Sequence, residues 1–90
     1  EFARHGHCSL EYKKRLWIIG GWSEIKNRGL NDTLYSSDGI NWHKIKKDGP
    51  WSGREDHTAL VFKDKIWIFG GMADEGNRWV WKNDIWYSSF

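Results

Sequence analysis

The stretch IWIFGG at residues 66–71 decides the fold, because LWIIGG at residues 16–21 is its copy fifty residues earlier in the chain. The similarity extends beyond this stretch: residues 4–21 align with residues 54–71, and eight of the eighteen aligned pairs are identical. The identical pairs are Arg4/Arg54, His7/His57, Leu10/Leu60, Lys13/Lys63, Trp17/Trp67, Ile18/Ile68, Gly20/Gly70 and Gly21/Gly71. A period of about 50 residues is typical of propellers and solenoid arrays, so we expect two consecutive structural repeats.

A second repeated block follows the first one. NDTLYSS at residues 31–37 returns as NDIWYSS at residues 83–89, fifty-two residues later because the segment in between is two residues longer. The segments between turn residues are short and rich in Trp, Ile, Tyr and Phe, which predicts strands. In the first repeat we expect strands at 7–12, 16–20, 33–36 and 41–46, the second being central because it is continuously apolar. No segment has a helical pattern, so the predicted class is all-β.

Three blocks carry a family resemblance. REDH at residues 54–57, IWIFGG at 66–71 and NDIWY at 83–87 together resemble a kelch repeat, as does the first copy from Arg4 to Trp42. SSDGINW at 36–42 followed by GPW at 49–51 is similar to the linking pattern of microbial kelch proteins with a galactose-oxidase-like central domain. WD repeats fit less well, because the chain has a double glycine, a longer period and no Trp-Asp ending. The resemblance implies β-propeller blades of four antiparallel strands.

The resemblance also implies how the blades are divided. Residues 1–49 would form the first kelch repeat and residues 50–90 the second, which is incomplete because no counterpart of Trp42 follows its third strand. We therefore expect about two blades of one propeller, the second lacking its outer strand. Propellers contain about 4 to 8 blades, so the missing blades would come from a longer chain or from identical subunits. The incomplete blade favours a fragment.

Composition excludes several classes of partner. A net charge of +2 favours neither nucleic acid nor an anionic membrane as a partner. The longest apolar stretches are much shorter than a membrane-spanning helix. The single cysteine, Cys8, cannot form an internal disulfide and assigns no compartment. Stability must then come from packing, to which eight tryptophans can contribute. No cofactor is predicted.

Most repeated residues are predicted to be structural. The glycine pairs 20/21 and 70/71 lack the downstream Gly, Lys and helix of a phosphate-binding loop, and we expect them to end the central strand where a neighbouring blade approaches closely. We expect Trp17, Trp67 and Trp42 to pack between blades. His7 and His57 are predicted to make a repeated structural hydrogen bond.

Two groupings suggest chemistry but are not repeated. His5, His7 and Cys8 resemble a metal-binding cluster, yet the second repeat has Glu55 and Thr58 at two of these positions, so no metal site is predicted. Asp56 and His57 with Ser52 nearby suggest a hydrolase, but no supporting motif surrounds them. We assign no catalytic residue.

The candidate binding residues lie where the two repeats differ. The resemblance implies that residues 22–30 and 72–82, with 1–6 and 48–56, are loops on one face of the propeller. They carry Trp and Arg, which often anchor interfaces and can grip sugars or carboxylates. The candidates are Trp22, Arg28, Trp51, Arg54, Arg78, Trp79 and Trp81.

Arg54 has a structural alternative as a member of the repeat, and Trp81 could begin a strand. We expect a binding module for a protein, peptide or glycan. The alternatives are part of a kelch-superfamily carbohydrate-active enzyme, either an oxidase or a sialic-acid-processing protein, and a two-blade unit that assembles into a closed ring.

Overall fold

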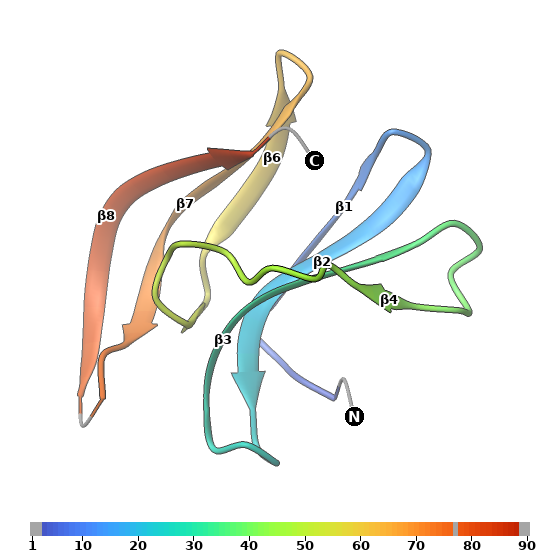
Figure 1. Cartoon of the computed structure of the whole chain (residues 1–90). Helices are drawn as coiled ribbons and strands as arrows, with labels where there is room; N and C mark the ends of the chain where they lie inside the picture. The colour runs from blue at the N-terminus through green and yellow to red at the C-terminus, as the bar shows by residue number, and fades with distance from the viewer. Residues whose placement is uncertain (1–2, 77, 89–90) are drawn as a thin grey trace.

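The computed structural model describes residues 3–76 and 78–88, and over these residues the chain consists of strands and turns without a helix. The strands form two four-stranded antiparallel sheets, one from each repeat (Figure 1). The first sheet contains, in order, β1 (Cys8–Tyr12), β2 (Arg15–Ser23), β3 (Arg28–Ser36) and β4 (His43–Lys44). The second contains β5 (Arg54–Glu55), β6 (Thr58–Phe62), β7 (Lys65–Asp74) and β8 (Trp79–Ser88). The all-β prediction is confirmed, and no helix of the described chain could cross a membrane.

The long strands of the two sheets repeat one register. One row of paired residues crosses the first sheet at Leu10, Trp17 and Tyr35, and its counterpart crosses the second sheet at Leu60, Trp67 and Tyr87. The hairpins β1–β2 and β6–β7 are joined by two-residue turns in which both residues have positive φ, at 13–14 and 63–64. Such turns match the twist of antiparallel strands. The sequence repeat is therefore a repeat of structure.

The double glycines form bulges rather than strand ends, which corrects the expected boundaries. The pairing register shifts at Gly20 and Gly70, and all four glycines of the two pairs have positive φ. Because a bulge absorbs this conformation without ending the ladder, β2 and β7 continue to Ser23 and Asp74. The expected close approach is present: a Cβ on Gly20 would lie 2.9 Å from the His57 ring across the sheets.

The two sheets are completed differently. The expected fourth strand at 41–46 is reduced to His43–Lys44, with one further hydrogen bond from the Ile45 amide to the Thr33 carbonyl. No described strand pairs with the outer edge of β8, the edge that corresponds to the β4 side of β3. The second sheet instead gains β5, which pairs with β7 in line with β6. Its counterpart in the first sheet is a single bridge between His5 and Trp22.

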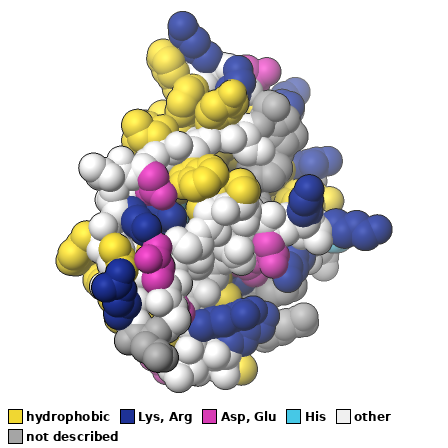
Figure 2. Space-filling view, turned by 60° about the vertical axis from the view of Figure 1, so that its left-hand side comes forward, with side chains coloured by type: hydrophobic (Ala, Val, Ile, Leu, Met, Phe, Trp, Pro, Cys, Tyr) yellow, Lys and Arg dark blue, Asp and Glu magenta, His cyan; other side chains and the backbone are white. Residues whose placement is uncertain are grey.

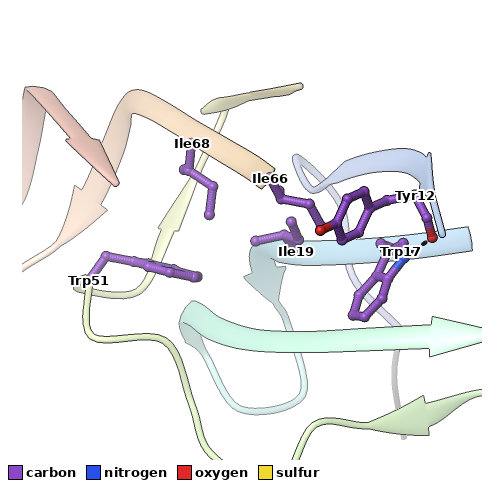
Figure 3. Close-up of a cluster of buried hydrophobic side chains, with 6 residues drawn as sticks. All are labelled: Tyr12, Trp17, Ile19, Trp51, Ile66 and Ile68. Atoms are coloured by element: carbon purple, nitrogen blue, oxygen red, sulfur yellow. Dashed lines mark hydrogen bonds between the residues drawn. The ribbon is translucent and has the colours of Figure 1, made fainter. Parts of the chain in front are cut away.

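The core lies between the sheets. Figure 3 shows Tyr12, Trp17 and Ile19 of the first sheet facing Ile66 and Ile68 of β7. Each of these five side chains is at most 4% exposed. Two hydrogen bonds fix the aromatic members: the Trp17 indole N–H donates to the Tyr12 carbonyl at 2.8 Å, and the Tyr12 hydroxyl donates to the Asp64 carbonyl of the opposite sheet at 2.6 Å. The second sheet therefore covers one face of the first.

Candidate functional site

The ends of the β2–β3 and β7–β8 hairpins meet and form one surface. Asp74, the last residue of β7, accepts a hydrogen bond from the Gly29 amide at 2.9 Å, and its own amide donates to the Gly53 carbonyl at 2.7 Å. Gly29 and Gly53 are so close that a Cβ on Gly29 would lie 2.9 Å from the Gly53 carbonyl carbon. These contacts join the two repeats at this end.

Three tryptophans gather at the joined hairpin ends. Trp22, near the end of β2, contacts Trp79 at the start of β8, with ring centroids 5.0 Å apart and planes tilted by 51°. Trp79 is 41% exposed and Trp81, two residues along β8, is 72% exposed. Since residues two apart on a strand point to the same side, Trp79 and Trp81 share one side of β8. Two exposed tryptophans on the same side of one strand are unusual for a surface that contacts only water.

Basic side chains lie next to these tryptophans. Arg28 begins β3 and Arg78 directly precedes β8, and both are exposed. On β8, Lys82 forms an ion pair with Glu75 at 2.5 Å, and the hydrogen bond from this lysine holds the pKa of Glu75 below its usual value. We call Trp22, Arg28, Arg78, Trp79 and Trp81 the hairpin-end surface. All five were predicted from the sequence as binding residues.

The expected loops are largely strands, which corrects their description. Of the described residues in 22–30 and 72–82, only 24–27, 75–76 and 78 lie outside strands. Trp22, Arg28, Trp79 and Trp81 are therefore held by strand pairing rather than by loops. Asn77 lies outside the described residues.

Arg54 does not belong to the hairpin-end surface. Its side chain is 1% exposed and is saturated by partners: it bonds to both Asp84 carboxylate oxygens, at 2.7 and 3.0 Å, and to the Gly70 carbonyl at 2.9 Å. Arg4 makes the matching bonds to Asp32 and the Gly20 carbonyl. The hydrogen bond from Arg54 lowers the pKa of Asp84 to about 2. This burial fits the structural alternative for Arg54, because its side chain ties β5 to Asp84 of β8, thirty residues later in the sequence.

Trp51, another candidate binding residue, is also buried and does not belong to the hairpin-end surface. It lies in the segment between the sheets, but it is 3% exposed and packs against Trp86 of β8, with ring centroids 6.4 Å apart. Its place at one end of the core in Figure 3 explains the burial. Its indole N–H has no acceptor among the described groups. A buried aromatic that closes the core cannot bind a ligand without opening the interface.

The two repeated histidines have different environments. His57 is buried and its Nε2 lies 2.9 Å from the Ile19 carbonyl of the first sheet, whereas His7 is exposed. Because a carbonyl can only accept, Nε2 of His57 carries the proton. Burial lowers the pKa of His57, and its Nδ1 is buried without a described partner. The hydrogen bond was predicted for both histidines; the structure shows it at His57, whereas the counterpart His7 is exposed.

Cys8, Ser52 and His57, which belong to the two groupings that suggested chemistry, make hydrogen bonds outside those groupings. The Cys8 thiol donates to the His57 carbonyl, and burial raises its pKa to about 11, so it stays protonated. Ser52 accepts from the Arg54 guanidinium, while His57 contacts the Ile19 carbonyl. Over the described residues, no group of three or more His, Cys, Asp or Glu side chains could hold a metal ion.

The three tryptophans predicted to pack between blades differ in burial. Trp17 is 2% exposed between the sheets, whereas Trp42 and Trp67 are partly buried. Trp67 donates its indole N–H to the Phe62 carbonyl at 2.9 Å, as Trp17 does to Tyr12, but its ring lies on the face of the second sheet that points away from the first. There it packs against Tyr87 of the same sheet, with ring centroids 5.0 Å apart, and it stays partly exposed on this face.

Comparison with known proteins identifies no relative: no family model matches the chain, and no curated protein matches it either.

Proposed function

We propose that the chain is a binding module, formed by two consecutive blades of a kelch-type propeller, and that the hairpin-end surface contacts a protein, peptide or glycan. The blade assignment is supported by the equal register of the two sheets and by their matching Arg–Asp pairs. The binding role is supported most by Trp81, a large aromatic side chain that stays 72% exposed beside the Trp22–Trp79 contact. Covering such a side chain on binding is favourable at about 25 cal/mol per Å² of apolar area.

The side chains suit two kinds of contact. Tryptophan offers a rigid apolar ring that packs against peptide side chains or stacks on sugar rings, and it loses little conformational entropy when it binds. Arg28 and Arg78 add guanidinium groups, which bind carboxylates through paired hydrogen bonds. An acidic peptide or an acidic glycan would use both kinds of residue. The surface depends on both repeats, because Trp22 comes from the first sheet and Trp79 from the second.

The test is binding to a glycan array and a peptide array, followed by titration of the best ligand. Trp81→Ala should weaken binding by at least about tenfold, as expected for a central interface tryptophan. Ile40→Ala is the matched control, because Ile40 is 81% exposed but lies in the turn that leads to β4. If Trp81→Ala and Ile40→Ala are both folded and Trp81→Ala binds the ligand with the same affinity as the wild type, the proposed surface is refuted.

A further inference from the structure

An apolar face of the second sheet remains uncovered. Leu60, Phe62 and Ile85 are 43–59% exposed, and with Trp67 and Phe69 they line a shallow hollow of about 380 Å³. Among the described residues, the lining consists of these hydrophobic side chains alone. In Figure 2, which brings the β8 side forward, hydrophobic side chains group near the top of the molecule and basic side chains border them. Apolar faces of this kind normally have a partner.

The repeat shows what covers the equivalent face. Leu10, Tyr12, Trp17 and Ile19 of the first sheet correspond to Leu60, Phe62, Trp67 and Phe69 of the second, listed in the same order. The four residues of the first sheet are packed against the second sheet, and three of them are at most 4% exposed. The exposed face is therefore the copy of a face that, in the first sheet, is an established interface.

The reverse side of the first sheet corresponds to the covering surface. Ile66 and Ile68 of β7 cover the first sheet, and their counterparts in β2 are Leu16 and Ile18. Leu16 is 46% exposed. One chain thus displays both halves of the interface: the uncovered face on its second sheet, and Leu16 on the outer side of its first.

We propose that the uncovered face of the second sheet binds the first sheet of a second copy of the chain, in the relation in which the second sheet covers the first. The contact is head-to-tail, so its repetition gives a closed ring or a filament. Polar contacts extend the relation: His7 of the second copy takes the place of His57 opposite the Phe69 carbonyl, and the Thr58 hydroxyl replaces the Cys8 thiol as donor to the backbone of that histidine.

Two positions change the repeated contact. Phe62 lacks the hydroxyl by which its counterpart Tyr12 donates to the Asp64 carbonyl. Trp81 corresponds to Gly29, which approaches the backbone of Gly53 closely. A tryptophan there keeps the second copy further away at the hairpin end, so the tightest contact lies towards the β6–β7 turn. Trp81→Gly should consequently strengthen self-association, whereas Trp81→Ala weakens ligand binding under the proposed function. The two ideas therefore fail independently.

The test uses sedimentation velocity over a range of concentrations, with reducing agent present because of Cys8. The wild type should form multiples of the 10.7 kDa chain. Leu60→Asp should weaken association by at least about tenfold, because a charge cannot be buried in an apolar contact. Ile25→Asp, at a 75% exposed site between β2 and β3, should associate like the wild type.

Mixing two variants tests the head-to-tail geometry. Leu60→Asp blocks the receiving face and Leu16→Asp blocks the inserting face, so each should be monomeric alone, while their mixture should give a dimer of twice the chain mass. Circular dichroism tests whether both variants are folded, and if either is not, Phe62→Lys replaces Leu60→Asp and Leu16→Lys replaces Leu16→Asp. A folded wild type that stays monomeric at all concentrations, or a mixture that stays monomeric, would overturn the proposal.

Discussion

Replacing Arg54 with Met should destabilise the fold by about 3 kcal/mol. The change keeps an apolar stem but removes the guanidinium, which is 1% exposed and holds Asp84, the Gly70 carbonyl and Ser52. Removing one partner of a buried ion pair costs about 3–5 kcal/mol, because the other charge stays buried. The Asp84 side chain is 30% exposed and can be partly hydrated, so the lower end applies.

Urea unfolding followed by tryptophan fluorescence measures this loss. With a slope of about 1–3 kcal/mol per molar urea, the midpoint should fall by about 1–3 M while the slope stays constant. The double variant Arg54→Met/Asp84→Leu is the control, and it should recover part of the stability because no unpaired carboxylate remains. A loss below about 1 kcal/mol for the single variant would place Arg54 among weak surface pairs and return it to the candidate binding residues.

Three further predictions follow from buried contacts. Burial depresses the pKa of His57 below its ordinary 6.5, so the unfolded chain binds the proton more readily than the folded chain. The free energy of unfolding should therefore fall as the pH drops below about 6.5. His57→Gln should reduce this pH dependence in urea titrations from pH 7 to 5. Gly71→Ala should lower the melting temperature more than Gly76→Ala: both have positive φ, but only the first Cβ meets a neighbour, 2.7 Å away, and equal losses would contradict the bulge packing. Tyr12→Phe should cost about 1 kcal/mol in urea unfolding, for the hydroxyl bond to Asp64; an unchanged midpoint would remove that bond from the interface.

The sequence repeat predicted most of the strands because local pattern and pairing agree. The apolar run at 66–71 and its copy identified the central strands, and the turns at 13–14 and 63–64 were recognisable from their hydrophilic residues. The strand ends were not predictable from the glycines alone. A double glycine permits a turn and a bulge equally, and the pairing of both flanks decides between them.

The candidate site was predicted only in part because burial depends on partners distant in sequence. Arg54 and Arg78 are both arginines in segments expected to be loops, yet one is buried against Asp84 and the other is exposed. A signal did exist, since Arg4/Arg54 repeats together with Asp32/Asp84, as structural pairs do. Trp51 gave no such signal, because its environment is formed only when the segment between the sheets folds over the core.

A nuclear Overhauser effect between the indole rings of Trp22 and Trp79 tests most directly whether both repeats build one binding surface. The ring centroids lie 5.0 Å apart, so cross-peaks between the indole protons are expected, and Trp22→Phe and Trp79→Phe assign them. Within the first sheet, the rings of Trp17 and Tyr35, 5.4 Å apart, provide an internal reference. Cross-peaks for both pairs would support a joint surface. A Trp17–Tyr35 signal without a Trp22–Trp79 signal would contradict it.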